Sequence, residues 1–544
     1  MMQIPDPIHG YIELDGMFAD IVNAPEFQRL RYVEQGSFRS VYPGARHDRF
    51  AHSLGTYHLA TKFVEHFFVN LEKDTDVVIG REEQERLSLT FRYAALLHDV
   101  GHAPFSHTTE GFFLEKKGKK LPLVWEELCD EAAKLDEQEG ELFSAREEIR
   151  GSAHEIVSAL LLIRNRDRFL NHRDGAKVDP VLAARMVIGF TYESGALPGV
   201  DDALLGVRNC LIQLLNCSVL DVDRLDYMLR DARMSGFVNA PLDIPCLANA
   251  VTAVRGEDGM LVNAYRDAAL RVFDLMFQAK LSHDAWVLAI PAGAYDAALL
   301  AHCIRQLPAG YIENVFSVEA LGQTGVEFNG KHYRLLNDVD VAADLKAQSG
   351  SPFDELWTRG LGERRIAAWR SYYEYHHTFN CPDAQLPKQK QLTPENVYGF
   401  FKPLMKAMKE KKRLVFDRDA YAAIEADGSA DARRAAKLLR GFLMDYEENK
   451  ENPGYSVVLL DRTNSFTLKL NPNEIRILFP NREDGIKRLP LRQGKYNYST
   501  YAELTGGANR VDFKADYFYL MRRGGLKWKQ LQKLRELLAE ELKK

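Results

Sequence analysis

RYAALLHDVGHAPFSH, residues 92–107, places His98 beside Asp99 at the end of an apolar stretch. Burying this pair without partners would cost several kcal/mol, because both side chains would lose their hydration. A divalent cation bound by both removes that cost, since imidazole and carboxylate are ligands of Mn, Fe, Zn, Ni and Mg. We expect Gly101 and Pro104 to end the helix that leads into the pair. Its apolar positions recur at nearly helical spacing, at Leu87, Leu89, Phe91, Ala94 and Leu97.

Two flanking segments supply further ligand types on predicted helices. Upstream, PGARHDRFAHSLG (residues 43–55) opens a helix with a histidine followed by Ser-Leu-Gly. Downstream, SVLDVDRLDYMLRDA (residues 218–232) has carboxylates at positions 221, 223, 226 and 231 in a helical context. A histidine, a His-Asp pair and a distant aspartate on three helices form an arrangement that resembles the HD phosphohydrolases. We expect Asp221 and Asp226 to be helix caps or ion-pair partners rather than ligands.

Six blocks of the sequence, in this order, resemble the characteristic blocks of the deoxynucleoside triphosphate (dNTP) triphosphohydrolases: PDPIHGYIEL, PEFQRLRYVEQG, YPGARHDRFAHSLG, HDVGHAPFSH, SAHE and DVDRLDYMLRDA. The likeness runs over roughly residues 4–290. It is greatest to the catalytic core of members that join a sterile-alpha-motif domain to an HD domain, and extends to the bacterial dGTPase-like members. Because the blocks begin at residue 5, we expect the sterile-alpha-motif domain to be missing here.

The resemblance implies a metal site and an acid that serves it. One divalent cation (Mn, Mg, Fe, Ni or Zn) would be bound by His52, His98, Asp99 and Asp223. A second Mg would accompany the triphosphate. His107 is expected to protonate the leaving 5′-oxygen, because an imidazole oriented by a carboxylate such as Glu110 is a suitable acid near neutral pH. His102 and His154 would position water or phosphate. The remaining candidates are expected to be ordinary core or surface histidines: His66, His283 and His376.

The resemblance also implies how the nucleotide would be held. Arg49 and Arg224 would bind phosphates, since guanidinium makes bidentate contacts that lysine cannot match. Gln35 and Asp231 would bind the sugar 3′-hydroxyl. Tyr227 would pack beneath the sugar, where a 2′-hydroxyl would clash.

Three positions depart from the family pattern. The family's guanine-reading activator site uses an Asp and an Arg in the second block, whereas this chain has Asn23 with Arg31. Loss of the carboxylate removes the acceptor for guanine N1 and its exocyclic amine, which argues against a guanine activator but leaves room for another nucleotide. Gly36 stands where a leucine flanks the base, and Val287 falls near a base-site tyrosine, so the preferred base stays open.

The composition limits the classes of protein to which this chain can belong. With 544 residues, 46% apolar residues and a formal net charge of −6, the chain is typical of a globular protein of several packed units. It has no long uncharged apolar window, and its N-terminus lacks a secretory signal, so we expect a cytoplasmic protein. Its six cysteines form no CxxC pair, which argues against disulfides and structural zinc. Lys and Arg are spread among the acids, so nucleic acid is not an indicated partner.

The periodicity predicts a mainly α fold. We expect an HD-type catalytic helical core over residues 1–350, a helical extension over 351–450, and a small β-sheet region with a terminal amphipathic helix over 451–544. In the last region YSVVLLDR, SFTLKLN and EIRILFPN are predicted to form a short antiparallel sheet. The charged stretch 126–150 is predicted to be a solvated helical excursion. The terminal helix is expected to dock through Leu531, Leu534, Leu537, Leu538 and Leu542.

These observations leave competing hypotheses about function. The first is hydrolysis of dNTPs to deoxynucleoside and inorganic triphosphate, regulated by nucleotides in a homo-oligomer (dimer, tetramer or hexamer), for dNTP pool control or depletion against phage. The second keeps the metal site but changes the substrate to a cyclic dinucleotide, an alarmone or a nucleoside monophosphate. The third is a catalytically silent nucleotide sensor. A further hypothesis makes the C-terminal sheet and helix an interaction module for a partner protein.

Overall fold

The computed structural model covers the whole chain and is mainly α-helical, which confirms the predicted fold class. It describes residues 1–37, 41–114, 122–145, 151–217, 220–236, 242–256, 259–283, 287–288, 290–350, 352–357, 365–446, 455–465, 475–478 and 514–544. Contacts group the chain into two compact units. The first comprises residues 1–283, 308–343 and 468–509, and the second comprises 284–307, 344–467 and 510–544. The expected three-region division stays a prediction.

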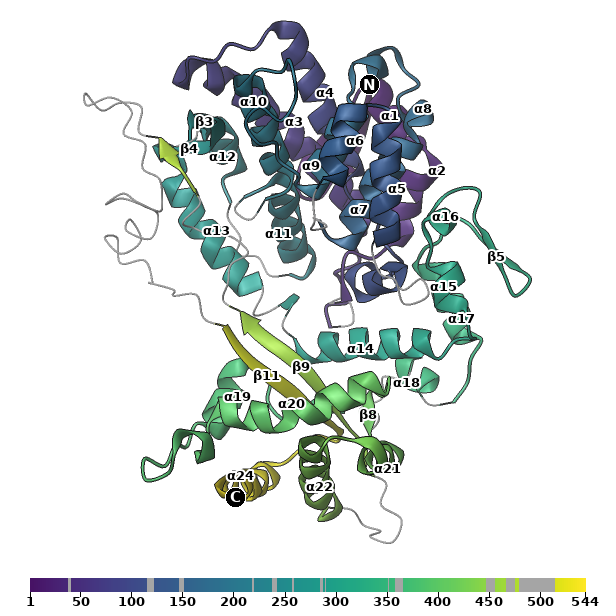
Figure 1. Cartoon of the computed structure of the whole chain (residues 1–544), viewed down its shortest axis with the longest axis vertical. Coiled ribbons are helices and arrows are strands. Elements are labelled where there is room, and N and C mark those ends of the chain that lie inside the picture. The colour runs from purple at the N-terminus through teal and green to yellow at the C-terminus, as the bar shows by residue number, and fades with distance from the viewer. Residues whose placement is uncertain are drawn as a thin grey trace. The chain divides into compact units, whose positions relative to one another are not determined.

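The first unit is a bundle of helices in which α3, α4, α7, α9, α10 and α11 pack on one another (Figure 1). Its helices are α1 (Gly16–Asn23), α2 (Pro25–Gln28), α3 (Arg49–Asp74), α4 (Arg81–Leu97), α5 (Pro122–Ala133), α6 (Glu137–Ser144), α7 (Ala153–Arg164), α8 (Arg166–Phe169), α9 (Pro180–Ile188), α10 (Asp202–Leu215), α11 (Val222–Met234), α12 (Ile244–Ala250), α13 (Leu270–His283), α15 (Tyr311–Val315) and α16 (Val318–Leu321). Helix α17 (Asp338–Lys346) begins in this unit.

Helix α3 begins at a capping aspartate, and helix α4 ends at the His-Asp pair. Asp48 caps α3 by accepting a hydrogen bond from the Ala51 N–H. Helix α4 ends at Leu97, with His98 as its C-cap, so it stops before the expected Gly101. Gly101 instead lets the backbone of α7 approach closely, because an added Cβ would lie 2.4 Å from the Ser158 nitrogen. The helix therefore delivers the His-Asp pair directly at its C-terminus.

Small sheets flank the bundle. The N-terminal hairpin pairs β1 (Met2–Asp6) with β2 (Gly10–Leu14), and a second hairpin pairs β5 (Val326–Phe328) with β6 (Lys331–Tyr333). In a third sheet β3 (Val251–Arg255) pairs with β4 (Leu261–Arg266), and β10 (Ile477–Leu478) joins β4 in parallel. This corrects the prediction for EIRILFPN, whose described strand belongs to this sheet and not to the C-terminal antiparallel one. Most of SFTLKLN lies outside the described residues.

The described part of the charged stretch 126–150 is helical and most of its charged side chains are exposed, as expected, but Glu139 is an exception. Glu139 on α6 is 5% exposed and accepts hydrogen bonds from Arg185 Nε at 2.5 Å and the Tyr192 hydroxyl at 2.6 Å. Phe143 is fully buried beneath the Arg185 guanidinium. A buried carboxylate needs such a partner, because leaving it unpaired would be strongly destabilising. The sequence pattern showed Glu139 but not its partner Arg185 on α9.

The second unit combines helices with the antiparallel sheet expected near the C-terminus, which is confirmed. The sheet order is β7 (Arg365–Ala367), β11 (Lys514–Arg523), β9 (Val457–Ser465) and β8 (Val415–Phe416). Its long strand β11 was not predicted. The Trp369 indole donates to the Phe518 carbonyl at 2.5 Å, which ties the sheet to the segment after β7. The helices are α14 (Pro291–Arg305), α18 (Phe353–Trp357), α19 (Tyr372–Phe379), α20 (Pro394–Glu410), α21 (Arg418–Asp427), α22 (Ala430–Met444) and α24 (Trp528–Lys543).

The terminal helix α24 docks within its own unit. Leu531, Leu534 and Leu538 are buried, and the helix contacts α22. Arg434 of α22 adds a hydrogen bond to the Glu541 carboxylate at 2.7 Å. The expected docking role of the leucine stripe is thereby confirmed for these three positions. Among the helices that the structure describes, none is both long enough and apolar enough to cross a membrane.

We expect Leu538→Ala to lower the free energy of unfolding of the protein by about 2–5 kcal/mol, because the fully buried side chain would leave a cavity. Leu537→Ala, on the same helix at a half-buried position, serves as the matched control and should cost less. Chemical unfolding followed by circular dichroism measures both. Equal losses for the two variants would contradict the docking of this face.

Candidate active site

Four predicted ligands from three helices meet at one point of the first unit. His52 lies in α3, His98 and Asp99 lie at the C-terminal end of α4, and Asp223 lies in the first turn of α11. His52 Nε2 is 2.9 Å from Asp223 Oδ1 and 3.3 Å from His98 Nε2. His52 Nε2 is also 3.6 Å from Asp99 Oδ2, and His98 Nε2 is 3.6 Å from Asp223 Oδ1. The structure therefore brings together the residue set that the sequence suggested.

The other ring nitrogen of each histidine is already used. His98 Nδ1 donates to the Ala95 carbonyl at 2.9 Å, and His52 Nδ1 donates to Asp226 Oδ2 at 2.7 Å. Such outer contacts fix the tautomer in which Nε2 carries the lone pair. Two lone pairs facing each other at 3.3 Å repel unless a cation or proton lies between them. Two imidazoles with two carboxylates are a suitable donor set for a divalent cation, so the residues fit the expected metal.

The electrostatics of this cluster favour positive charge. Burial alone would lower the pKa of His52, but hydrogen bonds with Asp223 and Asp226 outweigh it and raise that pKa to about 10. The Asp99 carboxylate remains ionised despite its burial, because Arg49 holds its pKa below the ordinary value. A buried site that binds a proton this strongly attracts a metal cation for the same electrostatic reason.

A network behind His52 fixes its orientation, and sequence reasoning found only part of it. Asp226 is fully buried, accepts from His52 and His9, and is bridged by Arg230 through two bonds of 2.9 Å. Arg230 also donates to Asp6 at 2.8 Å, at the end of β1. Asp226 is thus an ion-pair partner, as expected. The PDPIHG block is explained as well, because it brings Asp6 and His9 to the side of Asp226 and Arg230 behind His52, a predicted metal ligand.

Arg49 is buried in the middle of the site and bonded on every nitrogen. Its Nη1 donates to Asp99 Oδ2 at 2.8 Å, its Nε to Ser106 Oγ at 2.9 Å, and its Nη2 to the Gln35 carbonyl at 3.1 Å. The guanidinium thus lies against a predicted ligand, and it links Gln35 to the turn that precedes His107. Its role in binding phosphate stays a prediction.

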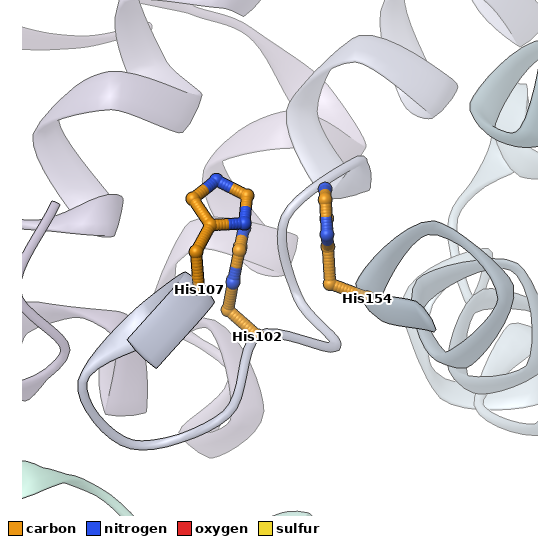
Figure 2. A group of neighbouring side chains, drawn as sticks. All are labelled: His102, His107 and His154. Carbon is orange, nitrogen blue, oxygen red and sulfur yellow. The ribbon is translucent and has the colours of Figure 1, made fainter. Parts of the chain in front are cut away.

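The three other histidines predicted for the active site, His102, His107 and His154, lie close together (Figure 2). Glu110 accepts from His107 Nδ1 at 2.8 Å and from His154 Nδ1 at 2.9 Å. Burial alone would raise the pKa of Glu110, but these bonds outweigh it and hold that pKa below the ordinary value. Burial alone would lower the pKa of His154, and Glu110 reverses this and raises it. Glu110 therefore favours a proton on both partners, but at His107 burial outweighs it and keeps that pKa below the ordinary value.

This cluster is a poor second metal site, although its ring nitrogens lie within 4.8 Å of one another. The rings of His102 and His154 are stacked (Figure 2). Their centroids are 4.0 Å apart and their planes are inclined by 14°. Nitrogen lone pairs lie in the ring plane, so stacked rings cannot direct two of them at one ion. His102 is fully buried, and its Nε2 lies 3.1 Å from Asp99 Oδ1. The arrangement suits proton transfer and phosphate contact better than coordination.

Asp231, the carboxylate predicted to bind the sugar, lies against His47 and His283, and the sequence analysis predicted neither contact. His47 Nε2 lies 2.7 Å from Asp231 Oδ1, and His283 Nε2 lies 3.0 Å from Oδ2. Tyr227, one turn earlier on α11, has its ring 6.1 Å from that of His283. His283 is a satisfied buried histidine, as expected, but it belongs to this group of residues. In the sequence, the feature that points to His283 is its position near the end of the region that resembles the dNTP triphosphohydrolases.

Two of the remaining predicted residues, Arg224 and Arg31, have local partners. Arg224 donates to the Cys217 carbonyl at 3.2 Å and lies 3.7 Å from Asp221, which caps α11 as expected. Arg31 stacks over the Phe50 ring at 3.5 Å. Asn23 is the last residue of α1. Their roles in binding phosphate or an activator stay predictions.

Comparison with known proteins agrees with this geometry. Residues 49–167 match the family model of the HD domain. The chain is similar to the protein named deoxynucleoside triphosphate triphosphohydrolase SAMHD1 of Bos taurus, with 44% identity over 115 residues, which are 21% of this chain and 18% of that protein. The Homo sapiens protein of the same name is 45% identical over 115 residues, covering 21% and 17%. That of Gallus gallus is 32% identical over 244 residues, covering 43% and 34%. The predicted resemblance is confirmed, and the matches span about a third or less of these relatives' lengths.

We expect Gly55→Ala to weaken metal binding. Gly55 faces Asp226 across the α3–α11 contact, and an added Cβ would lie 1.8 Å from Asp226 Oδ1 and 2.5 Å from Arg230 Nη2. The displaced carboxylate would release His52 Nδ1, and losing such a partner typically costs roughly 10–100-fold in metal affinity. Isothermal titration with Mn²⁺ measures this. The control is Gly399→Ala in α20, a helical position where an added Cβ meets no atom within 4 Å. Unchanged Mn²⁺ affinity in the Gly55 variant would contradict the supporting role of Asp226.

Proposed function

We propose that this protein is a metal-dependent phosphohydrolase that cleaves dNTPs to deoxynucleoside and inorganic triphosphate. The observation that carries the proposal is the convergence of two Nε2 lone pairs and two carboxylates on one point, beside the buried Arg49. The printed names of the similar proteins support the choice of substrate. Pool control or depletion of dNTPs against phage would be the biological setting.

The reaction needs a phosphorus held in place, an attacking water and a proton for the leaving group. A divalent cation bound by His52, His98, Asp99 and Asp223 would neutralise phosphate charge and lower the pKa of a water. Arg49 and Arg224 would bind phosphate oxygens. His102 and His154 would orient water or phosphate. His107 would donate its proton to the 5′-oxygen as the bond to the α-phosphorus breaks, and Glu110 would hold the ring in position.

Selection of the sugar would come from a separate group of residues. Asp231, with both oxygens oriented by His47 and His283, would accept a hydrogen bond from the 3′-hydroxyl, and Gln35 would contact the same hydroxyl. The Tyr227 ring would occupy the space that a 2′-hydroxyl needs. Activation by a nucleotide other than guanine at Asn23 and Arg31, and assembly into a homo-oligomer, complete the proposal.

The decisive experiment incubates the purified protein with each dNTP, singly and in pairs, with Mn²⁺ or Mg²⁺, and separates the products by chromatography. We expect deoxynucleoside and triphosphate in equal amounts, no product after chelation of the metal, and much slower cleavage of ribonucleotides. Asp223→Asn should abolish turnover and metal binding together. Equal cleavage of ribo- and deoxynucleotides would favour another HD phosphohydrolase substrate, and dNTP binding without any product would favour a sensor.

We expect Glu110→Gln to lower kcat by about 10²–10⁴-fold, the range for loss of a general acid. The carboxylate raises the pKa of His154 and favours the proton on His107, so its removal should lower both pKa values. Activity that requires a protonated imidazole would then be lost at lower pH. The alkaline limb of the profile of kcat/KM against pH should therefore move to lower pH than in the wild type. A fall in kcat with an unmoved alkaline limb would contradict this role.

A further inference from the structure

Asp338 joins two loops of the candidate site that are far apart in the sequence. It lies in the first turn of α17 and is 6% exposed. Its Oδ2 accepts a hydrogen bond from the Glu34 N–H at 2.9 Å, and its Oδ1 accepts one from the Phe105 N–H at 2.6 Å. Glu34 directly precedes Gln35, and Phe105 lies two residues before His107. One carboxylate therefore binds the backbone beside a predicted sugar contact and the backbone beside the predicted acid.

The backbone of the turn that Asp338 binds has a conformation that costs free energy. Phe105 and Ser106 have φ of 60° and 50°, a left-handed conformation that side chains other than glycine rarely adopt. Residues in such conformations persist only where the surrounding structure over-determines them, and they cluster at functional sites. Two successive residues of this kind directly precede His107. The orientation of that histidine thus depends on bonds that hold the turn.

Neighbouring bonds tie the same three segments together. Ser106 Oγ donates to the Glu34 carbonyl, so the turn and the Gln35 loop also contact each other directly. Arg29, 3% exposed, donates from Nη1 to the Leu336 carbonyl at 2.8 Å and from Nη2 to the Val100 carbonyl at 2.7 Å. Arg29 therefore links the segment before α17, two residues ahead of Asp338, to the turn that follows the His-Asp pair. These segments all belong to the first unit.

We propose that Asp338 is a positioning residue that sets the spacing between the sugar-binding loop at Gln35 and the proton-donating turn at His107. This inference rests on the proposed function for the roles of those two residues. A carboxylate is suited to the task because its two oxygens accept from two backbone N–H groups at once, and charged acceptors make the stronger hydrogen bonds. Loss of the carboxylate would release both loops together, while the four predicted metal ligands keep their own contacts.

The test is Asp338→Asn, which keeps the size of the side chain. The amide has a single oxygen, and its NH₂ group would face one of the two N–H donors, so at least one bond is lost. The matched control is Asp340→Asn, because Asp340 lies in the same helical turn and accepts from the Asn337 N–H. Should Asp338→Asn not fold by circular dichroism, Asp338→Glu carries the same test, since it keeps the charge and displaces both oxygens by one methylene.

Hydrogen–deuterium exchange followed by mass spectrometry measures the protection of backbone amides in both loops, and it needs no substrate. We expect faster exchange in peptides covering residues 33–37 and 103–107 in Asp338→Asn, and wild-type exchange in Asp340→Asn. With dNTP and Mn²⁺, KM should rise and kcat should fall, with kcat/KM reduced at least about tenfold, because small displacements of reacting groups cost rate steeply. Mn²⁺ affinity should stay at the wild-type value.

Two results would overturn the inference. One is exchange that increases in neither loop or in only one of them. The other is faster exchange in both loops with KM and kcat unchanged, which would make Asp338 merely structural. Failure of the proposed function would look different, because the wild type would then release no triphosphate from any dNTP while the exchange measurement still reported whether Asp338 holds the loops.

Discussion

The hydrogen bond from His52 Nδ1 to Asp226 is the interaction on which the rest of the site depends. It fixes the tautomer that leaves Nε2 for a cation, and it joins α3 to α11, which carry two of the predicted ligands. Its closeness requires Gly55, since any side chain there would overlap the Asp226 carboxylate. Arg230 and His9 then satisfy the rest of that carboxylate, so the N-terminal hairpin is fastened to the rear of the metal ligand.

The three carboxylates around this bond differ in their exposure to solvent. Asp226 and Asp99 are buried and each is paired with a buried arginine, Arg230 and Arg49. Asp223 has a side chain that is 39% exposed and bonds to His52. Buried charges are tolerated only when paired, so the arginines hold the two deeper carboxylates in their ionised form. Asp223 is the most exposed of these three carboxylates.

Much of the fold and of the metal site could be predicted, because both depend on local sequence. Apolar spacing predicts the helices. A His-Asp pair buried at a helix end is destabilising unless both side chains have a partner, and a cation is the partner that suits both. Partnerships across the chain could not be predicted in this way. The burial of Glu139 against Arg185, the parallel addition of β10 to β4 and the two histidines on Asp231 each depend on a residue that no local pattern connects to its partner.

The sequence by itself determined the helical class, the four candidate ligand positions and the resemblance to dNTP triphosphohydrolases. Only the tertiary structure decided how those ligands are oriented, which side chains stand behind them and which remote carboxylate holds the Gln35 and His107 loops. The physical reason is the range of the forces involved. Periodicity and capping act within a few residues along the chain, whereas the bonds of Asp226 and Asp338 form between segments more than a hundred residues apart, and only folding brings those segments together.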